Sequence, residues 1–122
     1  MVTIAELNLN LSNEIIEKIK VEATEEIKEI MFSDLIQVIL YGSCARGDYH
    51  ADSDVDIALL TKCDRYEVKK YDDALAKIAT ELAMKYFAVV NFVPLPYDEF
   101  LEKKEWYAYF KNIDQEGEVL YG

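Results

Sequence analysis

The feature that most constrains how this chain folds is a polar loop between two short apolar runs. The first run covers residues 35–41 and is followed directly by Gly42 and Ser43, and the second covers residues 55–60. Short apolar runs that are rich in β-branched residues and bounded by turn residues are typical of buried strands. The stretch therefore predicts two buried strands joined by a polar loop.

Two carboxylates, Asp54 and Asp56, lie two positions apart where the second run begins. A strand sends residues i and i+2 to the same face, so both acids point one way while Val55 and Ile57 point the other. Two adjacent like charges on a partly buried face cost free energy unless a cation neutralises them. The pattern predicts a magnesium site, and the alternative is that the acids cap the loop or pair with lysines.

Gly42 and Ser43 stand at a predicted turn between a strand and one helical turn over residues 43–47. Glycine lets the backbone approach a phosphate without a Cβ in the way. Ser43 offers a hydroxyl and an N–H group at the start of the helical turn, where an anion is favoured. The pair also suits a plain strand-to-helix turn, so a phosphate-binding role depends on the acids downstream.

Length and composition narrow the class of protein. The chain has 122 residues, which predicts a single domain over residues 1–122. Hydrophobic residues make up 52% and charged residues 30%, as in globular proteins. The formal net charge of -11 argues against direct binding of nucleic acid, because phosphate contacts need clustered Lys and Arg. A basic partner protein fits this charge better.

Membrane insertion and secretion are not expected. No apolar run approaches the roughly 18 residues that suggest a membrane span, and the first residues lack the basic start and long apolar block of a signal peptide. The two cysteines, Cys44 and Cys63, are therefore expected as reduced thiols in the cytoplasm. The single histidine, His50, completes no nucleophilic triad with Cys44.

Apolar residues at helical spacing predict two helices, over residues 13–31 and 65–85. Ser12, or the residue after it, can cap the first helix. Asp64 and Glu67 have the spacing of a capping pair for the second. The charged residues between the apolar ones are most simply solvated faces.

A third strand is predicted over residues 88–93, closed by Pro94 and Pro96, which cannot donate to a strand ladder. At the other end of the chain, residues 1–11 alternate leucine with asparagine in their second half. This alternation fits either a short strand or an apolar tail laid along the surface.

The C-terminal part predicts a helical region from Asp98 to residue 116, with Asp98 as its cap. The apolar spacing is irregular near its middle, so the region could be two pieces. Gly117 is a natural residue to follow a helix, and residues 118–121 could add an edge strand. The whole order predicts an α/β or α+β fold: a small mixed sheet of three to four strands flanked by helices.

The pattern Gly-Ser, ten residues, Asp-x-Asp resembles the signature of the nucleotidyltransferase superfamily, and the short chain resembles its minimal nucleotidyltransferase (MNT) branch. Arg46, Gly47 and Ser53 also fit the fuller form of the motif, and residues 112–121 are similar to the ending of many such chains. The resemblance implies a polymerase β-like fold, ATP as substrate and Mg²⁺ as cofactor, with two ions.

The resemblance also implies roles for the motif residues. Asp54 and Asp56 are the expected catalytic metal ligands, and Gly42 and Ser43 are expected at the phosphates of the nucleotide. The central motif carries most of the specificity of the resemblance.

Arg46 and Ser53 are the further loop residues assigned to nucleotide binding. Arg46 can contact the terminal phosphates, or it can fix the loop by bonding to Asp48 or Asp52; the sequence leaves both roles open. Ser53 is favoured as a brace of the loop over a direct substrate contact.

The sequence departs from the family pattern on the third strand, where fully equipped nucleotidyltransferases carry a third carboxylate. By alternation Val89, Asn91 and Val93 share one face, and Asn91 is the only polar residue of that run. Asparagine can offer a carbonyl oxygen to a metal but cannot act as a general base at neutral pH, and such assistance is typically worth about 10²–10⁴-fold. Asn91 is therefore expected in the catalytic set, with activity in doubt, unless it is an incidental polar residue at the strand end.

The resemblance implies an antitoxin that transfers AMP from ATP to a hydroxyl, typically a tyrosine, of a HEPN-family toxin. One alternative is a weak or inactive nucleotidyltransferase fold that neutralises its partner by binding, which Asn91 favours. A second alternative is transfer to a small molecule of the aminoglycoside type. Either a hetero-oligomer or a homodimer is expected.

Overall fold

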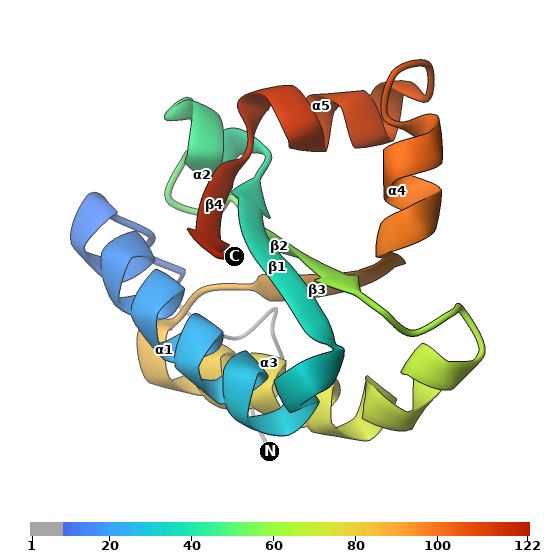
Figure 1. Ribbon diagram of the computed structural model, residues 1–122. Helices are drawn as coiled ribbons and strands as arrows, with labels where there is room; N and C mark the ends of the chain where they lie inside the picture. Colours follow the sequence, from blue (N-terminus) through green and yellow to red (C-terminus); the bar gives the residue numbers. More distant parts are fainter. Residues whose placement is uncertain (1–8) are drawn as a thin grey trace.

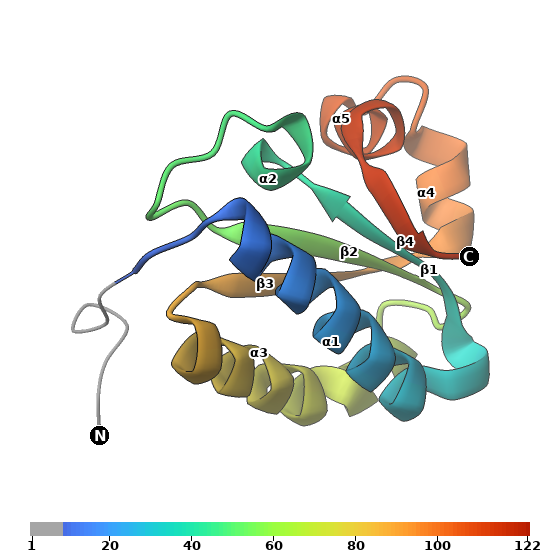
Figure 2. The same ribbon diagram turned by 90° about the vertical axis from the view of Figure 1, so that its left-hand side faces the viewer.

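The computed structural model of the protein describes residues 9–122, which form a sheet with helices on both of its faces (Figures 1 and 2). The helices are α1 (Asn13–Met31), α2 (Ser43–Arg46), α3 (Asp72–Tyr86), α4 (Tyr97–Lys103) and α5 (Ala108–Glu116). The strands are β1 (Leu35–Tyr41), β2 (Val55–Thr61), β3 (Val90–Pro96) and β4 (Glu118–Tyr121). Short 3₁₀ helices precede β1 (Phe32–Asp34) and α3 (Glu67–Tyr71).

The sheet is mixed, with the strand order β3-β2-β1-β4. β1 pairs in antiparallel fashion with β2 and with β4, whereas β2 and β3 run parallel. In this register Tyr41 lies opposite Asp56, and Asp56 lies opposite Asn91. The predicted mixed sheet of three to four strands is confirmed, with four strands.

The two faces of the sheet have separate cores. α1 and α3 cover one face, and α4 and α5 cover the other (Figure 2). Along β2, Val55, Ile57 and Leu59 belong to the core under α1 and α3, and Ala58 and Leu60 belong to the core under α4 and α5. This alternation fixes the direction of Asp56, which therefore shares the face of α4 and α5.

The helix predictions hold over most of their length. α1 covers residues 13–31, and the hydroxyl of Ser12 accepts the N–H of Ile15 at 3.3 Å as its cap. The carboxylate of Asp64 accepts the N–H of Glu67 at 2.7 Å, so the predicted capping pair is present. It begins the 3₁₀ helix Glu67–Tyr71, which leads into α3, so the helix predicted over residues 65–85 is two segments.

The predicted end of the third strand is wrong. Pro94 and Pro96 do not close the strand but lie within β3, opposite Leu59 and Thr61 of β2. β3 is an edge strand that bonds only to β2, and an edge strand donates to its one neighbour from alternate residues. Prolines two positions apart therefore leave the pairing intact.

The C-terminal helical region is indeed two pieces, α4 and α5. Asp98 is not the cap of α4, because Pro96 takes that place and Asp98 lies within the first turn. Gly117 follows α5 with an extended backbone, φ −70°, rather than the left-handed one typical of such glycines. A Cβ on Gly117 would lie 2.4 Å from the carbonyl oxygen of Ile113 and from a side-chain atom of Ile39, so close packing requires the glycine.

β4 is the predicted edge strand over residues 118–121. The prediction for residues 1–11 falls largely outside the described residues. Within them, Leu11 is buried and its N–H donates to the carbonyl of Ala51 at 2.9 Å. None of the helices within residues 9–122 is long and apolar enough to cross a membrane.

Candidate functional site

Asp54, Asp56 and Asn91 come together where β2 and β3 begin. The side-chain amide nitrogen of Asn91 donates to Oδ2 of Asp54 and to Oδ1 of Asp56, each at 3.0 Å. Because these two carboxylate oxygens accept from the same nitrogen, Asp54 Oδ2 and Asp56 Oδ1 lie no more than twice 3.0 Å apart. The alternation of β2 and the parallel register with β3 together bring both acids and the amide to one point.

Asp54 and Asp56 have no charged partner in the part of the chain that the structure describes. Within residues 9–122, neither Asp54 nor Asp56 forms an ion pair with a lysine or an arginine. The neutral amide of Asn91 is their only side-chain hydrogen-bond donor in this part of the chain. The geometry therefore leaves a concentrated negative charge, which is the property that attracts a cation.

The donor set fits Mg²⁺. Two carboxylates on one face supply hard oxygen ligands, and the amide of Asn91 can present its oxygen in place of its nitrogen by turning over. Among the described residues there is no cluster of three or more His, Cys, Asp or Glu that could hold a metal. Oxygens from phosphate or water would therefore have to complete the coordination of an ion at Asp54 and Asp56.

Gly42 brings the backbone directly against Asp56. Its φ is +76°, and a Cβ at this position would lie 2.9 Å from Oδ2 of Asp56. Any other residue would be strained at this φ and would displace the carboxylate. The carbonyl of Gly42 accepts the N–H groups of Ala45 and Arg46 at 3.1 Å, which starts α2 at Ser43, the residue after Gly42.

Cys44 ties α2 to the carboxylate loop. Its buried thiol donates to the backbone carbonyl of Asp54 at 3.4 Å. Burial, followed by the charge of Asp56, raises the pKa of Cys44 to about 11. The thiol is therefore protonated at neutral pH, and its position is that of a packing residue rather than a nucleophile.

The guanidinium of Arg46 is paired with two carboxylates. Its Nε donates to Asp48 at 3.3 Å, and its Nη1 donates to Glu116 of α5 at 3.4 Å. Of the two loop acids considered from the sequence, Asp48 is the partner within the described residues, and Asp52 is not. A contact of Arg46 with phosphates stays a prediction.

Ser53 closes the loop on itself. Its hydroxyl accepts the N–H of His50 at 2.8 Å, and its own N–H donates to the carbonyl of His50 at 3.1 Å. These two bonds shape the turn that leads into Asp54. Whether Ser53 also touches a nucleotide stays a prediction.

Sequence reasoning missed two residues at the edge of the site. Tyr41 lies opposite Asp56 in the sheet, and its hydroxyl is 2.7 Å from the hydroxyl of Tyr109 on α5. Burial and this hydrogen bond raise the pKa of Tyr41 above the ordinary range of a phenol. Strand alternation could have placed Tyr41 on the face of the acids, but only the packing of α5 reveals Tyr109.

The family of the chain follows from residues 22–117, which match the family described as a nucleotidyltransferase domain. The matched segment contains the whole Gly42–Asp56 motif and Asn91. The chain belongs to the nucleotidyltransferase domain family. Two proteins of Methanocaldococcus jannaschii, MJ0604 and MJ0141, are similar to this nucleotidyltransferase domain, and each is named as a candidate protein adenylyltransferase.

The similarity to these two proteins extends over most of their length. MJ0604 is 35% identical over 85 residues, which cover 70% of this chain and 77% of that protein. MJ0141 is 41% identical over 78 residues, which cover 64% of this chain and 76% of that protein.

Solved structures share the fold at lower sequence identity. One is a toxin–antitoxin structure with AMP-PNP, with a TM-score of 0.57 and 20% identity, covering 84% of this chain and 73% of that one. Another is a tri-AMPylated HEPN toxin of Shewanella oneidensis in complex with its MNT antitoxin, with a TM-score of 0.52 and 18% identity, covering 88% and 72%. The domain thus shares the fold of these structures, a polymerase β-like nucleotidyltransferase fold.

Proposed function

We propose that this nucleotidyltransferase domain is an Mg²⁺-dependent protein adenylyltransferase, which moves AMP from ATP to a hydroxyl of a partner protein. The observation that carries the proposal is the pair Asp54 and Asp56, held together by Asn91 and lacking a cationic neighbour among the described residues. The names of the two M. jannaschii relatives support a protein as the acceptor.

The chemistry is a displacement at the α-phosphorus of ATP. The acceptor oxygen forms a bond to that phosphorus, and the bond from the phosphorus to the bridging oxygen of pyrophosphate breaks. Mg²⁺, when bound, neutralises phosphate charge and polarises the phosphorus–oxygen bonds. Asp54 and Asp56 hold that ion, while Ser43 offers hydrogen bonds to phosphate oxygens and Gly42 leaves room for them.

The proton of the acceptor has no carboxylate base on β3. Asn91 cannot take a proton at neutral pH, so the acceptor hydroxyl loses it to water or to a phosphate oxygen. A phenol, with a pKa of about 10, ionises far more readily than an aliphatic hydroxyl. This difference supports tyrosine as the acceptor side chain.

We further propose that the acceptor is a HEPN-family toxin and that the chain acts as its antitoxin, in a hetero-oligomer. The structural relatives support this, because they are toxin–antitoxin complexes and one contains a tri-AMPylated HEPN toxin. The net charge of -11 suits a basic protein partner. Arg46 and Ser53 then serve the site by holding the loop that carries the acids, through Glu116 and His50.

The test is transfer of AMP to the protein encoded by the adjacent gene, which the proposal expects to be of the HEPN family. With ATP and Mg²⁺, intact-mass spectra of that protein should gain one or more AMP units. Asp54→Ala combined with Asp56→Ala should abolish the gain, because the metal ligands are lost. The matched control is Asp72→Ala combined with Asp73→Ala in the first turn of α3, which removes the same charge at another site. Equal transfer by both double variants would disprove the metal assignment.

A second candidate function is neutralisation of the partner by binding alone. Asn91 favours it, because the site lacks a third carboxylate and its amide already engages one oxygen of each acid. A stable complex of the two purified proteins without any added AMP mass would select this function over adenylylation.

A further inference from the structure

We propose that Tyr41, Trp106, Tyr107 and Tyr109, here called the aromatic rim, form the surface on which the acceptor protein docks. The partner surface has an apolar centre surrounded by Lys and Arg, and it carries the acceptor hydroxyl. The inference rests on the proposed protein adenylyltransferase function and adds the place where its protein substrate binds.

The rim begins beside the catalytic acids. Tyr41 and Asp56 are direct partners across β1 and β2, so their side chains share one face of the sheet. The Tyr41 hydroxyl lies 2.7 Å from that of Tyr109, and the two rings meet edge to face with centroids 6.0 Å apart. A segment bound over Tyr109 therefore lies next to the position where AMP would be transferred.

α5 is attached at both of its ends to residues that flank Gly42 and Ser43. Tyr109 near its start contacts Tyr41, and Glu116 at its end accepts from Arg46 of α2. Figure 1 shows α2 and α5 at the same end of the molecule. These two contacts fix the rim relative to the acids, so binding on the rim would also align an acceptor with the site.

Three of the four rim side chains are exposed, and Tyr41 is partly buried. Trp106 is 69% exposed, Tyr107 45% and Tyr109 39%. Their rings contact one another in sequence, with centroids 6.2 Å apart for Trp106 and Tyr107 and 6.3 Å for Tyr107 and Tyr109. Exposed Trp and Tyr side chains of this kind are the residues that most often dominate protein interfaces, and rings held in contact lose little entropy on binding.

The charge beside the rim indicates a basic partner. Glu102 and Glu105 precede Trp106 and form no ion pair within residues 9–122. The lysines between them are already engaged, Lys103 with Glu99 and Lys104 with Asp114. A cationic periphery on the partner would meet these free acids, whereas a triphosphate would be repelled by them.

Two exposed aromatic residues elsewhere provide matched controls. Tyr66 is 82% exposed beside the 3₁₀ helix Glu67–Tyr71, and Phe32 is 81% exposed after α1. Tyr66 follows the end of β2, and Phe32 precedes β1, whose first residue pairs with the last residue of β2. Asp54 and Asp56 lie at the other end of β2. Among the described residues neither ring is in contact with a rim ring, so truncating either one leaves the stacking of the rim intact.

The first experiment measures binding of the protein encoded by the adjacent gene, the expected HEPN partner, in the absence of ATP. Trp106→Ala combined with Tyr107→Ala should weaken the complex by about 10- to 100-fold, as for truncation of interface hot spots. Tyr66→Ala and Phe32→Ala should stay within about twofold. Because no ATP is present, the result does not depend on whether the chain transfers AMP.

The second experiment separates docking from nucleotide binding. Trp106 is the only tryptophan of the chain, so 5-fluorotryptophan gives one ¹⁹F resonance that reports on the rim. The HEPN protein should shift this resonance, and ATP with Mg²⁺ alone should not. In steady-state transfer, the rim variant should raise the KM for the HEPN protein and leave the KM for ATP unchanged.

Each other outcome overturns the proposal. An unchanged affinity in the rim variant, with a normal thermal unfolding transition, would place the docking surface elsewhere even if AMP is transferred. A raised KM for ATP, or a ¹⁹F shift caused by ATP alone, would make the rim part of the nucleotide site. If the double variant fails to fold, Trp106→Ser alone applies the same tests at the most exposed ring.

Discussion

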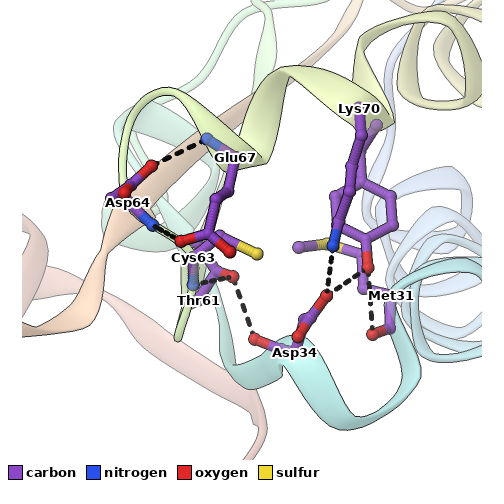
Figure 3. A network of polar contacts seen from close by, with 8 residues as sticks. Met31, Asp34, Thr61, Cys63, Asp64, Glu67 and Lys70 are labelled. Atoms are coloured by element: carbon purple, nitrogen blue, oxygen red, sulfur yellow. Dashed lines mark hydrogen bonds and ion pairs between the residues drawn. The ribbon is translucent and has the colours of Figure 1, made fainter.

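The two ends of β2 both carry polar side chains, and they differ in how the charges are balanced. Where β2 begins, Asp54 and Asp56 share a single neutral donor, the amide of Asn91. Where β2 ends, Thr61 joins a network around Asp34, whose carboxylate pairs with Lys70 (Figure 3).

At the end of β2, the side chains of Thr61 and Asp34 each form two polar contacts. The Thr61 hydroxyl donates to the backbone carbonyl of Asp34 at 2.9 Å and accepts the N–H of Cys63 at 3.1 Å. The carboxylate of Asp34 accepts from the Tyr71 hydroxyl at 2.6 Å and pairs with Lys70 at 3.2 Å. These contacts join β2 to the turn after α1 and to the helix that leads into α3.

The difference separates a structural polar cluster from a functional one. A structural cluster satisfies its donors and neutralises its charge internally, because unpaired charge costs stability. The unbalanced charge of Asp54 and Asp56 lowers the stability of the fold, as is typical of a site that a ligand completes. Changes at the two ends should therefore act on different properties: transfer at one end, and stability at the other.

The largest expected effect comes from Asn91→Asp, which adds a third carboxylate to the unbalanced end. A base on β3 should raise the rate of AMP transfer by about 10²-fold. Three adjacent acids should also lower the midpoint of thermal unfolding without Mg²⁺, and Mg²⁺ should restore it by binding the folded state. Transfer assays and thermal scans with and without Mg²⁺ check both effects.

The control for that substitution is Asn112→Asp, the same change on the exposed part of α5. It should alter neither the rate nor the response of the unfolding midpoint to Mg²⁺. If Asn91→Asp behaves like Asn112→Asp, Asn91 is not at the third ligand position.

Gly42→Ala should damage the unbalanced end through the backbone. Its φ of +76° and the approach of 2.9 Å to Asp56 predict a loss of unfolding free energy of about 1–3 kcal/mol together with a strong loss of transfer. Gly47→Ala is the matched control, because Gly47 has a φ of +87° with nothing near its Cβ position. Gly47→Ala should lower the free energy of unfolding but retain most of the AMP transfer. An equal loss of transfer in both variants would show that backbone strain alone, without the contact to Asp56, disables the site.

Tyr71→Phe tests the balanced end. It removes the hydroxyl that donates to Asp34, so the free energy of unfolding should fall by about 1–2 kcal/mol. AMP transfer should be unchanged at a temperature where the variant is folded. Chemical denaturation measures the first quantity, and Tyr66→Phe, on an exposed ring, should leave it unaltered. A loss of transfer without a loss of stability would erase the distinction between the two ends.

The sequence predicts one end of β2 better than the other, for a physical reason. Strand alternation alone puts Asp54 and Asp56 on one face, and a third strand beside β2 brings Asn91 to them. The contacts of Asp34 with Tyr71 and Lys70 depend on how segments pack rather than on a local repeat. No pattern within a single element carries that information.

The same limit explains the features of the site that the sequence did not predict. Tyr41 and Tyr109 are 68 positions apart, and Arg46 and Glu116 are 70 positions apart, so their contacts require the placement of α5. The prolines of β3 were predicted to end the strand because its position at the sheet edge follows only from the strand order. Local composition determines which segments form helices and strands, whereas packing determines which of these segments contact one another.

The smallest expected effect is the pH dependence of stability at the balanced end. The hydrogen bond from Tyr71 and the pairing with Lys70 lower the pKa of Asp34 below its ordinary value of 3.8. A lowered pKa stabilises the fold above pH 3.8, and this contribution is lost as the pH falls through the folded value. For Tyr71, burial and the bond to Asp34 raise the pKa from 10.0 to about 12, so its contribution is present below pH 10.0 and is lost as the pH rises toward 12.

The measurement that isolates this effect compares wild type with Asp34→Asn across the pH range. Other acids titrate equally in both proteins, so the difference between their unfolding midpoints reports on Asp34. That difference should be largest near neutral pH and should shrink as the pH falls below 3.8, where the wild type loses its advantage. Parallel curves for Asp34→Asn would mean that its charge is not balanced by Lys70 and Tyr71, and the two ends of β2 would then be alike.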